Sequence, residues 1–319
     1  MSGDFPVGID DIDLRRQLVA EGWTDRDIAY AVRSGEMCKV RYGAYVRAAL
    51  MAQMDAVGHA RVRSRAVLRT AHATSVLTNH NALSEYEVPL WGVDLSETHL
   101  TRTDGKSGRR EAGVVHHRAR LDADDWRMVN GIPVMNPPRA ALEVVLTHPP
   151  EVGLVAVSGV LSRGLASREQ LLAANEAAER WPNSLNARLV LARADAGLTS
   201  VAEARTWHLF HEQRIPRPEP QVAVPDEQGE IVGIVGIVDF LWRELGVFLE
   251  FDGRIRYTKY RRPGETLEDY LMREKKREEK ICLLTGWTCV RITWPDLENP
   301  LRTARRIQAL LESRSRKGA

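Results

Sequence analysis

The sequence contains very little cysteine. Among its 319 residues there are three, Cys38, Cys282 and Cys289, and no two of them form a C-x-x-C pair. An odd number without metal-ligand spacing argues against a disulfide framework and against a structural zinc site. The first residues, from Met1 to Asp13, are acidic where a secretory signal would be basic and then apolar. These absences favour a protein of the reducing cytoplasm.

Long apolar runs and an excess of one charge are also absent. No stretch is apolar over the roughly 18 residues that a membrane span needs, so no membrane partner is expected. The 45 basic and 43 acidic side chains give a formal net charge of +2. That balance says little about a polyanionic partner, because binding depends on where the basic residues lie. The length suits two or three domains.

The first segment, residues 1–50, has the order helix, helix, hairpin. Apolar residues from Leu14 to Val19 repeat at helical spacing, and Gly22 ends that helix. Thr24 is a good N-cap for a second helix, with an acidic residue three positions later as in a capping box. The alternation from Met37 to Val46 predicts a hairpin. This order is that of a winged helix-turn-helix.

Basic and aromatic residues cluster in the same segment, as DNA binding requires. A recognition helix would enter the major groove while the hairpin contacts phosphates. The alternative is a small helical domain with a solvated basic face, but the order of elements and the charge agree on DNA. The expected DNA contacts are Arg33, Lys39, Arg41, Tyr42 and Arg47.

The middle segment, residues 51–193, predicts an α+β domain. A helical pattern runs from Arg61 to Leu77, and short strands are expected at Thr98–Thr103, Gly113–His117 and Ile132–Met135, with helices after them. Neighbouring His116 and His117 would point to opposite faces of a strand and form no ligand pair. No nucleophile with a base, no glycine-rich phosphate loop and no metal spacing occurs here, so no small-molecule cofactor is expected.

The last segment, residues 194–319, predicts an α/β domain with a central mixed sheet. Ser200 caps a helix, and a Pro-rich break then leads into extended structure. The expected elements that follow are strands at Gln221–Val224, Ile231–Asp239 and Val247–Asp252, a helix at Leu267–Leu284, a strand at Thr288–Thr293 and a helix at Leu301–Leu311. The predicted fold class of the whole chain is mixed α/β.

Acidic side chains gather on one strand of this last segment. Because side chains alternate along a strand, Phe248, Glu250 and Asp252 share one face. Two carboxylates side by side on an apolar strand are costly unless something compensates them. Asp239 ends the preceding strand, close enough to join them, and together they could hold Mg²⁺ for phosphodiester cleavage. Glu203, on the helix before the sheet, is the candidate fourth acid.

The same residues have a plain structural interpretation. Asp239 could cap a turn, and the acids could pair with the nearby arginines Arg254, Arg256 and Arg261. Spacing alone leaves the two interpretations level. On the helix from Glu268 to Lys280 the alternating charges favour a solvated face with ion pairs four residues apart.

Three motifs of the last segment resemble the very-short-patch-repair branch of the PD-(D/E)xK nuclease superfamily. They are Val238–Trp242, Leu249–Gly253 and Gly286–Arg291. The resemblance implies a restriction-endonuclease-like fold and a site made of Glu203, Asp239, Glu250, Asp252 and Lys259. This sequence departs from the motif at Asp252, where such nucleases usually have lysine. Lys259, Lys275 or Lys276 would have to replace that cation, so cleavage is in question while metal binding is not.

The first two segments resemble AbiEi-type antitoxins. The hairpin Val40–Val46 matches their winged helix, and Asn130–Val134 with Pro138–Leu142 matches the middle of long AbiEi-like proteins. This resemblance implies a DNA-binding autorepressor of a type IV toxin–antitoxin or phage-defence system. Two alternatives stay open: an active Mg²⁺-dependent endonuclease targeted by its winged helix, or a C-terminal domain that only binds a cognate toxin.

Overall fold

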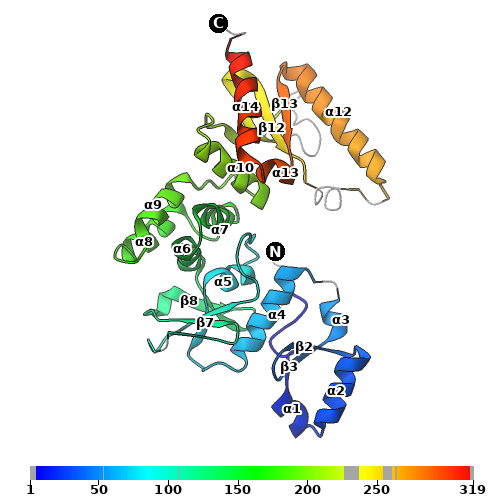
Figure 1. Ribbon diagram of the computed structural model, residues 1–319, viewed down its shortest axis with the longest axis vertical. Coiled ribbons are helices and arrows are strands. Elements are labelled where there is room, and N and C mark those ends of the chain that lie inside the picture. Colours follow the sequence, from blue (N-terminus) through cyan, green and yellow to red (C-terminus); the bar gives the residue numbers. More distant parts are fainter. Residues whose placement is uncertain are drawn as a thin grey trace. The chain divides into compact units, whose positions relative to one another are not determined.

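The chain is mixed α/β, as expected, in a computed structural model that describes residues 5–52, 54–106, 108–225, 237–253, 261–262 and 264–316 (Figure 1). It divides into two compact units, Met1–Arg193 and Ala194–Ala319, which we call unit 1 and unit 2. Unit 1 contains both of the first two predicted segments. In the described part of the chain, no helix has the length and apolar character to cross a membrane.

Unit 1 begins with two helices and a hairpin. Its first elements are β1 (Asp13–Leu14), α1 (Arg15–Ala20), α2 (Asp25–Ser34), β2 (Met37–Arg41), β3 (Ala44–Arg47) and α3 (Ala48–Met51). The strands pair antiparallel in the order β1-β3-β2. The prediction for α2 is confirmed, since Thr24 forms its capping box and Gly35 ends it in the left-handed conformation. The expected first helix was wrong at its start, because Leu14 lies in β1.

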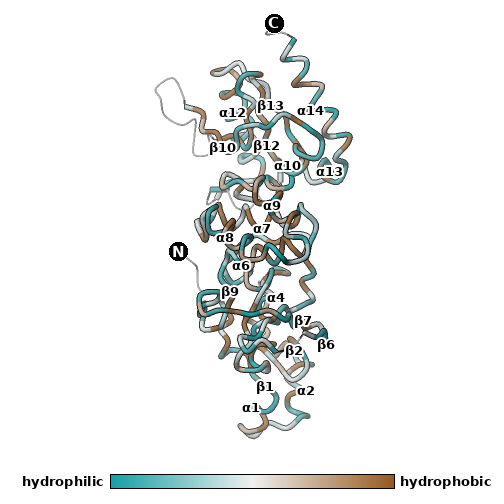
Figure 2. The backbone as a smooth tube through the Cα atoms, turned by 90° about the vertical axis from the view of Figure 1, so that its left-hand side faces the viewer, coloured by the Kyte–Doolittle hydropathy of each residue, from teal (hydrophilic) through white to brown (hydrophobic). Residues whose placement is uncertain are grey.

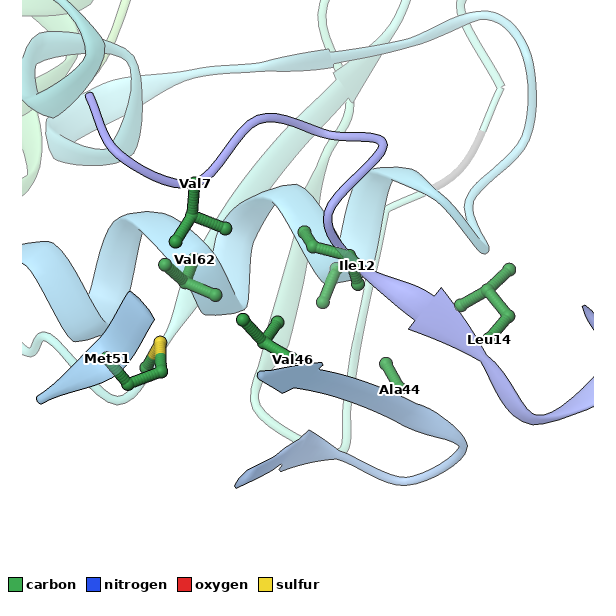
Figure 3. Close-up of a cluster of buried hydrophobic side chains, with 8 residues drawn as sticks. Val7, Ile12, Leu14, Ala44, Val46, Met51 and Val62 are labelled. Carbon is green, nitrogen blue, oxygen red and sulfur yellow. The ribbon is translucent and has the colours of Figure 1, made fainter. Parts of the chain in front are cut away.

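A hydrophobic cluster joins this hairpin to the next helix, α4 (Ala56–Leu68). Figure 3 shows Val62 of α4 beside Val7 and Val46, with Ile12 nearby. Val7, Ile12 and Val46 have no exposed surface, and full burial of such a side chain contributes about 1.5–3 kcal/mol. The sheet of the hairpin therefore packs on α4, while Met37 of β2 joins Leu18 and Ile28 in a separate cluster with α1 and α2.

A second sheet occupies the middle of unit 1. Among the described residues its strands follow the order β6-β7-β5-β4-β9-β8, with parallel pairs at β4–β9 and β5–β7. The elements are β4 (Ser75–Leu77), α5 (Asn79–Glu85), β5 (Thr98–Arg102), β6 (Arg109–Glu111), β7 (Val114–His117), η1 (Ala123–Asp125), β8 (Trp126–Val129) and β9 (Ile132–Met135). The helical pattern expected to reach Leu77 was wrong, since α4 ends at Leu68 and β4 follows.

Four helices complete unit 1: α6 (Pro137–Thr147), α7 (Pro150–Ser162), α8 (Arg168–Ala177) and α9 (Ser184–Arg193). Pro137 and Pro138 occupy the first turn of α6, as predicted. Every residue of α7 from Val152 to Val160 is buried, and the tube through α6 and α7 is largely brown in Figure 2. A helix that is apolar all round belongs in a protein interior.

One buried ion pair ties α4 to α5. The Glu85 carboxylate accepts two hydrogen bonds from Arg65, at 2.9 and 2.6 Å, and one from Asn130 at 3.1 Å. Arg61 approaches the same carboxylate to 3.3 Å. Both arginines lie against the ring of Phe5, so the N-terminal segment is fastened to α4 as well.

Unit 2 is a mixed sheet with helices on both faces. Its elements are α10 (Val201–Glu212), β10 (Glu219–Ala223), β11 (Ile237–Trp242), η2 (Arg243–Leu245), β12 (Val247–Phe251), α12 (Leu267–Thr285), β13 (Thr288–Ile292), α13 (Trp294–Leu297) and α14 (Pro300–Ser315). The described strands follow the order β10-β11-β12-β13, antiparallel except for the parallel pair β12–β13. The expected mixed sheet is confirmed. The turn expected at 226–229 lies outside the described residues.

Because side chains alternate along a strand, one face of this sheet can be assigned to α10 and the other to α12. Phe240 contacts Trp207 and Phe210 of α10, with ring centroids 5.8 and 5.1 Å apart. Phe248 belongs to a second cluster that includes Ile281 of α12. Residues of β12 an even number of positions from Phe248 lie on the same face as Phe248, toward α12. This is the face that carries Glu250.

Candidate nucleic-acid interface and acidic cluster

An exposed stripe of α2 carries two arginines and a tyrosine. Arg26, Tyr30 and Arg33 are spaced four and three residues apart, so they lie on one face of the helix. The side of α2 that carries Ile28 and Ala31 is buried against Leu18 and Met37. Tyr30 is 63% exposed, although a large aromatic side chain normally avoids water. The stripe is therefore exposed to solvent and carries two cations.

The hairpin turn between β2 and β3 carries a second exposed aromatic side chain. Tyr42 is 87% exposed, and the Lys39 ammonium lies 5.6 Å from the centre of its ring. Gly43, with φ of 70°, allows the tight turn. Arg47, at the end of β3, is exposed. Of the predicted DNA contacts, Arg33, Lys39, Tyr42 and Arg47 are therefore all accessible to solvent.

Arg41 lies in different surroundings from the other predicted DNA contacts. The pairing of β2 with β3 is irregular between Lys39 and Arg41, and such a bulge redirects the side chain that follows it. Arg41 is half-buried, donates a hydrogen bond to the Thr70 hydroxyl at 3.3 Å, and has its pKa lowered by burial. It therefore faces the end of α4 and is not part of the exposed hairpin tip.

In unit 2, Glu250 is almost completely buried and is held by two arginines. Its Oε1 accepts a hydrogen bond of 2.6 Å from Arg277 of α12, and its Oε2 lies 3.2 Å from Arg291 of β13. Burial lowers the pKa of Arg277, but the charge and hydrogen bond of Glu250, together with Glu274, raise it overall. Burial likewise lowers the pKa of Arg291, but the charges of Glu250 and Glu278 outweigh it and raise that pKa overall. The partners of Glu250 are thus two arginines that sequence analysis did not propose.

The other two predicted acids of the sheet lie close by. The buried Asp239 carboxylate accepts the backbone N–H of Phe251 at 2.7 Å, so it sits at the strand that carries Glu250. Asp252 Oδ2 lies 3.9 Å from Arg291. Asp252 and Arg291 also line a cavity of about 140 Å³ together with Tyr270 of α12. Asp239 of β11 and Glu250 of β12 thus lie on neighbouring strands, and Asp252 follows the end of β12 and shares Arg291 with Glu250.

Glu203 makes hydrogen bonds at the start of α10. Its carboxylate accepts hydrogen bonds from the backbone N–H and the hydroxyl of Thr199, at 2.7 and 3.0 Å. Its own N–H bonds to Ser200, the residue that caps α10. These contacts satisfy the start of a helix. Lys259, the predicted replacement for the missing motif lysine, lies outside the described residues, whereas Lys275 lines the cavity beside Asp252.

A ligand set for a cation can be assembled only in part. Atoms of Glu250, Glu278 and Cys289 lie within 4.8 Å of one another. Burial, and then the charge of Glu250, raise the pKa of the Cys289 thiol, so it stays protonated. A protonated thiol is a poor ligand for a hard ion such as Mg²⁺, and Arg291 already pairs with Glu278 at 2.6 Å. The arrangement fits an ion-pair network better than a magnesium site.

A group of histidines in unit 1 was not anticipated from the sequence. His117 of β7 and His99 of β5 are joined by a hydrogen bond of 2.8 Å, and His80 of α5 packs edge-on against His99 at 4.8 Å. His148 lies 6.2 Å from His80. Burial, and then the charge of His148, lower the pKa of His80 to about 4. His116 points to the other face of the sheet, as strand alternation predicts.

Some of the missed residues had a readable signal. The spacing of Arg26 and Tyr30 with Arg33 could have been found as a helical stripe. Arg277 falls on the buried stripe of α12 with Tyr270 and Ile281, at positions seven and four residues apart. The histidines come from separate parts of the chain, so no short-range sequence pattern predicts that they are in contact.

No protein-family model matches the sequence, and no curated protein matches it. Among solved structures, the chain is similar to the crystal structure of the RV2827C protein from Mycobacterium tuberculosis, with 14% sequence identity and a TM-score of 0.38. The match covers 61% of this chain and 75% of that chain. A likeness at this level supports no statement about the site.

Proposed function

We propose that the chain is a DNA-binding transcriptional regulator of the AbiEi antitoxin type, with α2 as its recognition helix and the β2–β3 hairpin as its wing. The observation that carries the proposal is the exposed stripe of Arg26, Tyr30 and Arg33 on α2. Arginine forms bidentate hydrogen bonds to guanine in the major groove, which is wide enough to admit a helix. Tyrosine adds contact area and a hydroxyl at low entropic cost.

The wing supplies contacts of another kind. Lys39 and Arg47 are exposed cations suited to phosphate oxygens, which fix the protein on the duplex without reading its sequence. Tyr42, beside Lys39, offers a flat surface to a sugar or a base edge. Binding through this surface would weaken steeply as salt rises, because each phosphate contact releases a counterion.

Fluorescence anisotropy with the full chain and the duplex upstream of its own gene tests the proposal. We expect the double variant Arg26→Gln with Arg33→Gln to weaken binding by about 30-fold or more, since each of the two lost base contacts costs about 1–3 kcal/mol. The matched control is Arg120→Gln, whose side chain is 89% exposed on the same unit. Lys39→Gln should lower affinity equally for this duplex and an unrelated one, and flatten the salt dependence.

Two results would contradict the DNA proposal. One is binding that does not depend on salt. The other is an affinity that the α2 double variant and Arg120→Gln leave equally unchanged. Circular dichroism of each variant checks that the fold is retained.

A second candidate function is Mg²⁺-dependent cleavage of nucleic acid by unit 2. The observation in its favour is that Glu250 Oε2, although buried, accepts no hydrogen bond of good geometry from the described residues. An oxygen with free lone pairs beside Asp239 and Asp252 could accept a cation if Arg291 moved away. Incubation with plasmid, single-stranded DNA and RNA in Mg²⁺ or Mn²⁺ tests it. Cleavage must appear in the wild type and vanish in Glu250→Gln. Otherwise this site does not cleave.

A further inference from the structure

Unit 1 contains a large cavity that the proposed DNA surface does not use. Its volume is about 640 Å³, within the range of small-ligand sites. Arg41 of the hairpin lines one side, and the end of α4 lines another through Val67 and Thr70. The remaining wall is one face of the middle sheet, from β4 across β5 and β7 to β6.

The cavity is strongly cationic. Among the described residues, the cationic side chains that line it are Arg41, Arg102, Lys106 and Arg109, and the one lining carboxylate is that of Glu111. In Figure 2 the β6 strand on its rim is coloured hydrophilic. Such a concentration of one sign in a hollow with apolar walls raises the local concentration of anions.

The arginines of the cavity differ in how their charge is balanced. Arg102 pairs with Asp104, with Nε 2.9 Å from Oδ1, and Arg109 pairs with Glu111 at 3.2 Å. Arg41 has no carboxylate within ion-pair distance among the described residues. It donates a hydrogen bond to the Thr70 hydroxyl, and burial lowers its pKa. A half-buried guanidinium without a counter-charge is unfavourable unless an anion completes it.

Two further polar groups of the cavity wall lack partners among the described residues. Ser75 is 3% exposed, and its hydroxyl makes no hydrogen bond. It lies directly across β4–β5 from Arg102, so both side chains point to the same face. Nδ1 of His116, on the neighbouring strand, is also unsatisfied. Buried polar groups are normally hydrogen-bonded, and these orphans point to a ligand that supplies the missing bonds.

Apolar surface lies beside the charges. Val67, Leu100 and Val114 line the cavity, and Val67 and Val114 keep a small accessible surface, 5% and 6%. A ligand that only carried charge would leave this surface unused. A ring system placed against it would gain about 25 cal/mol for each Å² removed from water.

We propose that this cavity binds a small phosphate-bearing molecule of the nucleoside di- or triphosphate class. Its phosphates would take hydrogen bonds from Arg41 and Lys106, with Arg102 and Ser75 deeper in the cavity, while its base would lie on the apolar wall. Arginine suits this role because its planar fork matches two phosphate oxygens at once. Because Arg41 belongs to the hairpin, the ligand would tie the hairpin to the middle sheet.

Isothermal titration calorimetry and thermal shift of the full chain test the proposal, with ATP, ADP, GTP, pyrophosphate, inorganic phosphate and a short duplex DNA as probes. We expect saturable binding of a nucleotide that raises Tm. Arg41→Gln should weaken it by about 10-fold or more, the effect of losing a hydrogen bond to a charged group. Lys106→Gln, at an exposed position where folding is not at stake, should weaken it a few-fold.

The matched control is Arg120→Gln, which lies outside the cavity lining and should bind like the wild type. Arg26→Gln with Arg33→Gln should also leave nucleotide binding intact, which separates this test from that of DNA binding. The proposal is overturned if no nucleotide binds saturably, or if neither Arg41→Gln nor Lys106→Gln changes the affinity. It is equally overturned if inorganic phosphate binds as tightly as nucleotides, or if only the duplex competes for the cavity.

Discussion

Each unit of the molecule buries one glutamate between two arginines, and the two sites differ in how well the carboxylate is satisfied. In unit 1, Glu85 has a fully buried side chain and accepts a two-pronged hydrogen bond from Arg65, at 2.9 and 2.6 Å. Asn130 and Arg61 each add one more hydrogen bond, at 3.1 and 3.3 Å. Burial alone would raise the pKa of Glu85, but Arg65 and then Arg61 hold it below its ordinary value.

In unit 2, Glu250 is equally buried, but one of its oxygens accepts no hydrogen bond of good geometry from the described residues. Arg291, the nearby cation, is about one-third exposed and is shared with Glu278 and Asp252. A fork that grips one carboxylate fixes a structure, whereas an arginine shared by three acids can exchange partners. The comparison therefore separates a site that holds the fold from a site where chemistry or ligand exchange is feasible.

The largest expected effect comes from breaking the site in unit 1. Glu85→Gln removes the charge that compensates Arg61 and Arg65, and losing one partner of a buried pair costs about 3–5 kcal/mol. We expect a fall of that size in the free energy of unfolding, measured by urea denaturation. Asp122→Asn, in an exposed pair with Arg120, is the control and should leave stability within error. A loss for Glu85→Gln no larger than the control's would remove the distinction.

The second-largest effect is expected in unit 1, whose stability should fall as the pH is lowered. The folded-state pKa of His80 is about 4 and that of His99 about 3, against an ordinary value of 6.5. In the unfolded chain these histidines take up protons below pH 6.5, while the folded chain excludes them. Their stabilisation is complete above that pH and is lost as pH falls toward 4, by about 3 kcal/mol for His80.

The stabilisation from Glu143 depends on pH in the opposite direction, so it has to be measured separately from that of the histidines. Burial raises its pKa to about 7 from 4.5, so its contribution is complete below pH 4.5 and is lost as pH rises through 7. The variant Glu143→Gln should therefore lose stability more steeply than the wild type between pH 6.5 and 4.5. Hydrogen exchange resolved by strand should show the loss at β5, in unit 1. A flat profile, or the same slope in both proteins, would refute this account.

The smallest effect is expected in unit 2. Glu250→Gln leaves Arg277 with Glu274, at 3.2 Å, and leaves Arg291 with Glu278. Because both arginines keep an acidic partner, we expect a loss of only about 1–3 kcal/mol, the cost of a hydrogen bond to a charged group. Exchange protection at β12 measures it locally. A loss as large as that of Glu85→Gln would mean that the site in unit 2 is as rigid as the other.

Local chemistry explains which elements could be predicted from the sequence. The cap at Thr24, the turn at Gly43 and the prolines at the start of α6 each act within a few residues, so their elements were expected in nearly the right places. The mixed sheet of unit 2 followed from apolar runs separated by turn residues, and its central strands β11 and β12 are buried on both faces. The predicted grouping of Glu250 with Asp252 on one face agrees with the contact of both side chains with Arg291.

What could not be predicted depends on distant partners. Strand β4 is only three residues long and continues the apolar pattern of α4, so it was read as helix. Glu250 meets Arg277 and Arg291 only because α12 and β13 fold back over β12. The bulge that turns Arg41 away from Tyr42 leaves no trace in the residue pattern. In each case, tertiary pairing decides what the local sequence leaves open.

The cluster that joins the hairpin to α4 has a consequence for modularity. Val62 and Ala66 complete the apolar environment of Ile12 and Val46. A piece cut after Leu50 would lack Val62 and Ala66, and would expose an apolar face of its sheet to water. Recombination that moves the proposed DNA-binding element between proteins would have to carry α4 with it, so the portable piece is longer than helix, helix and hairpin.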